Sequence, residues 1–285
     1  MYVLTIPNFD LSQIYESCQD ISVKRIFGYE RTAYLFFRGE DMLKVEQVGD
    51  RVLFSCTDDQ FYDKWFDFFD LSTDYSVLNA MVNDVKSSKS IMDAARQSSG
   101  MHILSQDPWE CILKETVFDG CKPSVAISRL ESIKEASMKE NGKTLKGFGY
   151  IKWRPLPNPD QLESSMELLD WFCDTEVVSM CISLVEWSKC HRELLVASGS
   201  HSKDEVRTEL SKLGFSKHKV DRIMAYGFGF HDEPCFSEKQ EKQIKLETGV
   251  DIETLMEFEM PDLSSKAAYV GTIMARQQAM KNGRS

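Results

Sequence analysis

The segment Phe61-Tyr-Asp-Lys-Trp-Phe-Asp-Phe-Phe-Asp-Leu-Ser-Thr-Asp74 separates two kinds of local pattern in this chain. Its aromatic residues recur at helical spacing, which predicts an amphipathic segment that packs on a sheet. Short β-branched and aromatic runs precede it, with turn-forming glycines between them; they are residues 2–6, 32–37, 42–45 and 51–55. Runs of this kind are typical of the strands of antiparallel hairpins.

Beyond this segment the apolar residues follow a helical period. Capping residues such as Ser72-Thr73-Asp74 support several helix starts. The helices predicted from this pattern cover residues 74–85, 88–97, 108–117, 124–138, 160–173, 176–187, 204–213, 217–226 and 263–280. The fold class is therefore α+β, with an antiparallel sheet domain over residues 1–71 and a helical domain over residues 72–285.

Composition excludes several classes of protein. The chain has 285 residues, of which 42% are hydrophobic and 28% charged, as in ordinary globular proteins. No apolar run is long enough to cross a membrane, and residues 1–10 lack the features of a signal peptide. The net charge of −11 argues against a general electrostatic attraction to nucleic acid.

The cysteines and histidines predict no metal site. None of the eight cysteines forms a C-x-x-C pair, and the five histidines form no H-E-x-x-H motif. Without an export signal, we expect reduced thiols in a cytoplasmic protein. We expect no cofactor.

Four stretches, in this order, resemble segments of the bacterial 8-oxoguanine DNA glycosylases, which belong to the helix-hairpin-helix superfamily. They are Phe9-Asp-Leu-Ser-Gln-Ile-Tyr-Glu-Ser17, Phe69-Asp-Leu-Ser-Thr-Asp-Tyr75, Ile103-Leu-Ser-Gln-Asp-Pro-Trp-Glu110 and Ile223-Met-Ala-Tyr-Gly-Phe-Gly-Phe-His-Asp232. The resemblance implies an antiparallel sheet followed by a helical, two-lobed glycosylase-like region. It also implies a DNA-binding hairpin, here within residues 211–226.

The family's chemistry is base flipping followed by attack of a hairpin lysine on the sugar, assisted by a downstream aspartate. Here Gly214 matches the first glycine of the hairpin, but the second position holds Ser216. The lysine position carries His218, and the aspartate position carries Ser237. A serine hydroxyl cannot supply the fixed charge of a carboxylate. Asp232, Glu233 and Glu238 lie nearby in the sequence and are candidates to replace that carboxylate.

The positions that form the family's base pocket are altered as well. Cys18 stands where a glycine carbonyl marks the oxidised base, and Arg222 replaces a cysteine that stacks on it. Gly271 and Ala275 replace a base-reading glutamine and a stacking phenylalanine. The resemblance therefore implies the loss of glycosylase and lyase chemistry.

Other roles remain open for the hairpin residues. His218 is a candidate general base for a monofunctional glycosylase, against the simpler interpretation of an exposed histidine at a helix start. Lys212, Gly214, Lys217 and Lys219 are candidate contacts for phosphate or for a partner, against a solvated basic face. A one-residue change of register would make Lys217 or Lys219 the nucleophile.

Three hypotheses for function follow. The first is a catalytically degenerate glycosylase-like protein that acts as a binding or regulatory protein, for example as an inhibitor in phage–host conflict. The second is an active glycosylase for a different, bulkier base, since small residues at Gly271 and Ala275 would enlarge the pocket. The third is a base-modifying enzyme on phage hypermodified DNA. The first hypothesis favours a protein partner over DNA, and no membrane is expected.

Overall fold

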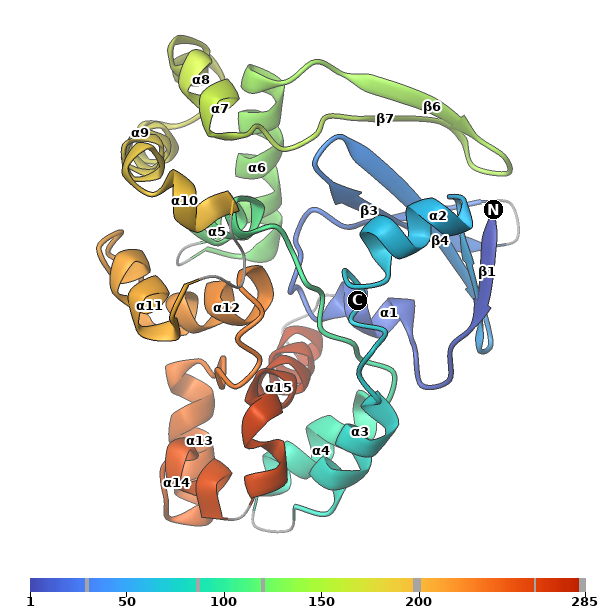
Figure 1. Cartoon of the computed structure of the whole chain (residues 1–285), viewed down its shortest axis with the longest axis vertical. Coiled ribbons are helices and arrows are strands. Elements are labelled where there is room, and N and C mark those ends of the chain that lie inside the picture. The colour runs from blue at the N-terminus through green and yellow to red at the C-terminus, as the bar shows by residue number, and fades with distance from the viewer. Residues whose placement is uncertain (29–30, 86–87, 119–120, 197–200, 259, 282–285) are drawn as a thin grey trace. The chain divides into compact units, whose positions relative to one another are not determined.

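The structure is a computed structural model that describes residues 1–28, 31–85, 88–118, 121–196, 201–258 and 260–281. It contains a five-stranded sheet, a separate two-stranded ribbon and a largely helical remainder (Figure 1). The strands are β1 (Tyr2–Thr5), β2 (Lys24–Phe27), β3 (Thr32–Arg38), β4 (Asp41–Val48), β5 (Arg51–Phe54), β6 (Asn141–Leu145) and β7 (Gly149–Trp153).

The five-stranded sheet has the order β1-β5-β4-β3-β2. Its pairings are antiparallel, with Tyr2 opposite Phe54, Leu35 opposite Lys44 and Lys24 opposite Leu35. The predicted class, an N-terminal antiparallel sheet followed by a mostly helical region, is confirmed. Strands β1, β3, β4 and β5 were predicted, but β2 was not, because Lys24 and Arg25 interrupt its apolar pattern.

The chain divides into two compact units, each built from separate stretches of sequence. Unit 1 comprises residues 1–19, 47–105 and 216–285, and unit 2 comprises residues 20–46 and 106–215. The predicted domains, divided at residue 71, differ from this division. One reason is that Leu35 and Phe37 on β3 share a core with Leu145 on β6, which ties part of the sheet to unit 2.

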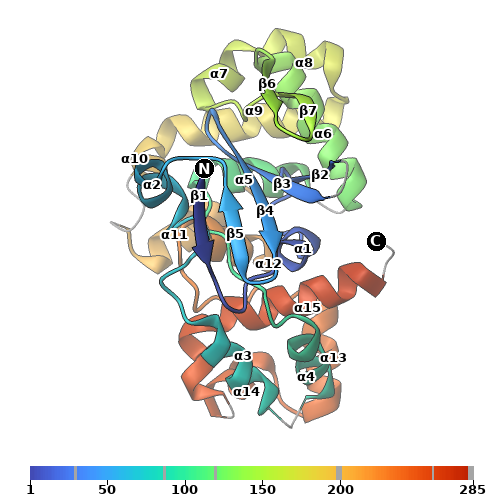
Figure 2. The same cartoon turned by 90° about the vertical axis from the view of Figure 1, so that its right-hand side faces the viewer.

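Unit 1 contains α1 (Leu11–Glu16), α2 (Asp58–Gln60), a π-helical turn (Phe61–Trp65), α3 (Tyr75–Asn83), α4 (Lys89–Gln97), α12 (Lys217–Gly227), α13 (Glu238–Thr248), α14 (Ile252–Phe258), a 3-10 turn (Pro261–Lys266) and α15 (Ala267–Lys281). The aromatic segment packs on β5 as predicted, since the rings of Phe54 and Phe61 lie 4.6 Å apart. Figure 2 shows α3, α4, α13, α14 and α15 gathered together. The sequence analysis missed α1, α13 and α14; α13 buries only Gln240 and Ile244, so it has little apolar period.

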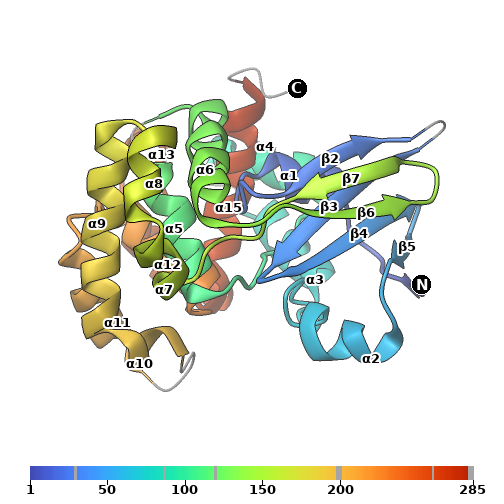
Figure 3. The same ribbon diagram turned by 90° about the horizontal axis from the view of Figure 1, so that it is seen from above.

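Unit 2 contains α5 (Pro108–Val117), α6 (Pro123–Ser137), α7 (Pro159–Ser164), α8 (Met166–Phe172), α9 (Thr175–Cys190), α10 (Arg192–Val196) and α11 (Lys203–Ser211). The ribbon β6–β7 lies alongside β2 and β3 (Figure 3) and places Ile151 and Trp153 against Leu35 and Phe37. This ribbon was not predicted, because glycines and lysines obscure its alternation.

The helix predicted over residues 160–173 is broken into α7 and α8. The hydroxyl of Ser165 donates to the carbonyls of Gln161 and Leu162, at 3.0 and 2.9 Å, in competition with the helical backbone bonds. No helix among the described residues is long and apolar enough to cross a membrane. All eight cysteines are thiols rather than members of disulfides.

Candidate functional site

The predicted catalytic and base-pocket positions all lie in unit 1. Cys18 follows α1, His218 and Arg222 lie on α12, Ser237 precedes α13, and Gly271 and Ala275 lie on α15. The local fold positions them through buried helix faces: Val220, Ile223 and Met224 on α12 and Val270 and Ile273 on α15 are almost fully buried.

Arg222 and Cys18 are in direct contact. The Nη2 of Arg222 donates to the backbone carbonyl oxygen of Cys18 at 3.2 Å, and the guanidinium lies over the Tyr226 ring, 5.1 Å from its centroid. Arg222 is only 5% exposed. Cys18 has φ of 58°, the left-handed region that favours glycine. The loop therefore keeps a glycine-like backbone, while its carbonyl oxygen is bonded to a side chain of the same protein.

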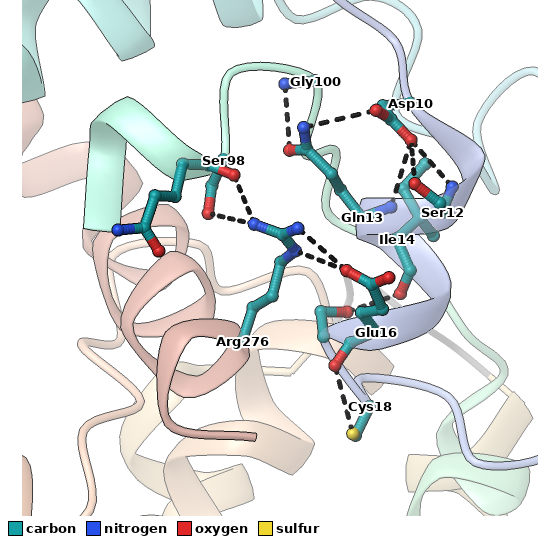
Figure 4. Close-up of polar contacts among 11 residues, drawn as sticks. Asp10, Ser12, Gln13, Ile14, Glu16, Cys18, Ser98, Gly100 and Arg276 are labelled. Atoms are coloured by element: carbon teal, nitrogen blue, oxygen red, sulfur yellow. Dashed lines mark hydrogen bonds and ion pairs between the residues drawn. The ribbon is translucent and has the colours of Figure 1, made fainter. Parts of the chain in front are cut away.

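A second arginine holds the same loop. Arg276, on α15, pairs with the carboxylate of Glu16, with Nη2 2.8 Å from Oε2, and donates to the carbonyl of Gln97 and, at 3.2 Å, to the Ser98 hydroxyl (Figure 4). The thiol of Cys18 in turn donates to the Glu16 carbonyl at 3.3 Å. Arginines from two helices thus fix the loop that carries Cys18.

Gly271 is a point of close backbone approach. A Cβ atom at this position would overlap the carbonyl oxygen of Pro234 and lie 3.2 Å from the Cβ of Cys235. Cys235 also donates from its thiol to the Asp221 carbonyl at 3.3 Å, which holds this loop against α12. The expectation that Gly271 enlarges a pocket is wrong, because backbone fills the space. Ala275 is half-buried.

The resemblance assigns the catalytic lysine and aspartate to positions 218 and 237, which hold a histidine and a serine here. Ser237 is the N-cap residue before α13, and both its backbone N–H and its hydroxyl donate to Gln240 Oε1, at 2.8 and 2.9 Å. His218 lies in the first turn of α12 and is half-buried rather than exposed. Of the candidate replacement carboxylates, Glu233 is buried whereas Asp232 and Glu238 are exposed.

Lys217 lies in a cluster of carboxylates. Its Nζ is 3.3 Å from Asp221 Oδ2, 3.6 Å from Glu241 Oε1 and 3.5 Å from Glu253 Oε1. Burial acts to lower the pKa of Lys217, but the three carboxylates prevail and raise it. An imine-forming lysine must be neutral, so this environment disfavours Lys217 as a nucleophile.

The remaining hairpin lysines do not form a solvated basic face. Lys219 is 6% exposed. In unit 2, the Nζ of Lys212 lies 2.6 Å from Glu209 Oε2. Gly214 has φ of 76°, with open space where a side chain would stand, so it keeps the conformation that a hairpin glycine provides.

Arg276 and Tyr226 were not among the predicted site residues, although Tyr226 lies under the guanidinium of Arg222. Arg276 follows Ala275 directly, and a charged residue within an otherwise buried helix was the available signal. No group of three or more histidine, cysteine, aspartate or glutamate side chains is placed to hold a metal ion within the described ranges.

Comparison with known proteins finds one matching family model and solved structures of similar fold. The family model for the 8-oxoguanine DNA glycosylase N-terminal domain matches residues 1–112. The chain resembles the bacterial 8-oxoguanine DNA glycosylases. The apo-form of the Clostridium acetobutylicum 8-oxoguanine glycosylase/lyase is 18% identical, with a TM-score of 0.78 over 96% of this chain and 95% of that one.

Two further solved structures show the same fold. MBOgg1, solved with a low affinity DNA ligand, is 19% identical with a TM-score of 0.81, over 99% of this chain and 96% of that one. The 3-methyladenine DNA-glycosylase from Archaeoglobus fulgidus is 10% identical with a TM-score of 0.67, over 98% and 99% of the two chains. No curated protein sequence matches the chain.

Proposed function

We propose that this glycosylase-like protein no longer excises bases and acts by binding, as a regulatory or inhibitory protein. The observation that carries the proposal is the contact between Arg222 and Cys18. The resemblance assigns the carbonyl at Cys18 to recognition of the oxidised base and position 222 to stacking on it. Here the Cys18 carbonyl accepts a hydrogen bond from Arg222, so neither group is available to a base.

The surroundings of this contact support the same conclusion. Backbone at Pro234 and Cys235 fills the space beside Gly271, so a glutamine there has no room. Position 218 lacks the amine that forms an imine, and position 237 lacks a carboxylate. The hypothesis of a glycosylase for a bulkier base depended on extra space at Gly271 and therefore loses its main support.

The basic groups of the hairpin favour a protein partner over DNA. Lys212 and Lys217 are paired with carboxylates, and Lys219 and Arg222 are buried. Few of these charges are therefore available to displace counterions from a phosphate backbone. The Clostridium acetobutylicum 8-oxoguanine glycosylase/lyase has also been solved with double-stranded DNA. Whether this chain binds DNA is an outcome of the test below.

A panel of duplexes tests the proposal. Duplexes that contain 8-oxoguanine, uracil or alkylated bases are incubated with the purified protein, and released bases are measured by mass spectrometry. We expect no release from any duplex, and weak binding that disappears with added salt. Release of any base would contradict the proposal. Duplex binding that resists added salt would show that the binding partner is DNA rather than a protein.

A further inference from the structure

Helix α8 in unit 2 exposes an unusual apolar face. Leu168, Trp171 and Phe172 are 50%, 82% and 44% exposed. They stand at i, i+3 and i+4, so they form one stripe on one side of the helix. Leu169, beside Phe172 around the helix, is fully buried, and α8 packs against α6. The exposed stripe is therefore not needed to hold the helix in place.

The chain around this stripe is strongly acidic. Residues 155–188 contain seven aspartates and glutamates and no lysine, arginine or histidine. Some of these acids are paired from outside the segment: Arg129 lies 2.6 Å from Glu176, and Lys189 lies 2.5 Å from Glu163. Glu167 and Asp170, on α8 itself, are exposed and pair with no basic residue that the structure describes.

The helical geometry places the two α8 carboxylates along one edge of the apolar stripe. At about 100° per residue, Glu167 falls next to Trp171, and Asp170 follows on the same side. An exposed tryptophan with flanking leucine and phenylalanine is the type of cluster that anchors protein interfaces. The two carboxylates place a negative edge beside that anchor.

We propose that the α8 face, defined as Leu168, Trp171, Phe172, Glu167 and Asp170, binds a partner protein through an apolar pocket bordered by lysine or arginine. Charge complementarity selects this occupant. Phosphates of nucleic acid and anionic lipid head groups would be repelled by the carboxylates. A second copy of the chain carries the same net charge of −11 and is disfavoured for the same reason. The inference rests on the proposed function, for which it supplies the binding surface.

A designed peptide probes this recognition chemistry directly. The probe is a fluorescein-labelled amphipathic helical peptide with a leucine stripe bordered by lysines. The control peptide has glutamates in place of the lysines. Anisotropy titration into the full-length protein should show binding of the basic peptide only. Trp171→Ala should weaken binding roughly tenfold or more. Glu167→Gln with Asp170→Asn should weaken it severalfold at about 50 mM salt and much less at about 500 mM.

Phe258→Ala is the matched control, because Phe258 is 73% exposed but lies on α14 of unit 1. It should leave peptide binding unchanged. Since the substituted α8 residues are exposed, unaltered thermal unfolding should show that each variant is folded. Equal binding of both peptides, or binding that survives Trp171→Ala, would overturn the proposal.

The other occupants give distinct results. Self-association in analytical ultracentrifugation that Trp171→Ala abolishes would assign the face to a second copy and overturn the proposal. Flotation with vesicles of phosphatidylcholine and phosphatidylserine that needs Trp171 would assign it to a membrane. Peptide binding by a protein that also releases bases would overturn the proposed function and leave the α8 face standing. A protein that neither binds the peptide nor releases bases would overturn the inference about the α8 face and leave the proposed function standing.

Discussion

The guanidinium of Arg222 and the carbonyl of Cys18 are 204 residues apart in sequence and 3.2 Å apart in the structure. The contact joins α12 to the loop after α1 at the two positions that the resemblance assigns to base recognition. A hydrogen bond from a charged donor to a buried carbonyl is stronger than an average one. Opening this site for a flipped base would require breaking the contact.

Arg222→Met should destabilise the protein by about 2 kcal/mol, because the buried Cys18 carbonyl would lose its charged donor. Urea unfolding followed by circular dichroism measures the change. Lys212→Met, at an exposed position, is the control and should change stability little. A variant at position 222 as stable as the wild type would show that the contact contributes little.

Gly271→Ala should destabilise the protein by about 2 kcal/mol, because the added methyl group overlaps the Pro234 carbonyl and forces backbone to move. Gly271→Gln should be worse. Ala275→Ser, on the same helix at a half-buried position, is the control. If Gly271→Gln folds with wild-type stability, there is room for a base-reading side chain and the glycosylase hypothesis recovers.

Borohydride treatment in the presence of 8-oxoguanine duplex should trap no covalent adduct. His218 cannot form the stable imine that a lysine forms, and the carboxylates around Lys217 keep its amine protonated. The Clostridium acetobutylicum enzyme is a positive control for the assay. Efficient trapping that is lost in Lys217→Gln or Lys219→Gln would show that the catalytic register is shifted by one residue.

The double variant His218→Lys and Ser237→Asp should remain inactive on 8-oxoguanine. It restores two catalytic groups but leaves the Cys18 carbonyl bonded to Arg222 and the space at Gly271 filled. A flipped base that lacks its stacking partners loses roughly 1–3 kcal/mol for each. Base release at a rate near that of an active glycosylase would limit the degeneracy to two point losses.

Lowering the pH from about 6.5 to about 4 should destabilise the protein through His102. Burial lowers the pKa of His102 to about 4, although its ring lies 3.2 Å from the carbonyls of Phe69 and Asn8. In this window the unfolded chain holds a proton on His102 that the folded chain lacks, so stability falls as pH falls. His102→Gln should show a shallower pH dependence in urea unfolding; identical slopes would contradict the assignment.

The sequence was sufficient for the fold class, because an antiparallel sheet followed by helices produces two different apolar periods. The β-branched and aromatic runs that form β3 and β5 are visible in the sequence, and so are the apolar residues at helical spacing in α5 and α12. The ribbon β6–β7 and helix α13 were missed because their packing depends on few apolar side chains, such as Ile151 and Ile244. Tertiary contact, rather than local propensity, decides such elements.

The site was only partly accessible from sequence. The assignment of Cys18, Arg222, His218 and Ser237 to site positions comes from the resemblance and stays a prediction. The contact of Arg222 with Cys18 does not, because it depends on the path of α12 relative to a loop far away in sequence. The close approach of Pro234 to Gly271 also cannot be predicted from the sequence. It shows that the small residue at position 271 makes room for backbone and not for a larger pocket.

The division of the chain has a consequence for its synthesis. Unit 1 combines residues 1–19 and 47–105 with residues 216–285, and Glu247 of α13 accepts hydrogen bonds from Ser88 and Ser90 at the start of α4. Its core therefore stays incomplete on the ribosome until residues 216–285 have emerged, while Phe54, Phe68 and Phe69 are already made. Such a nascent chain keeps apolar surface exposed for much of its translation, so its yield should depend on chaperones more than that of a protein folding in sequence order.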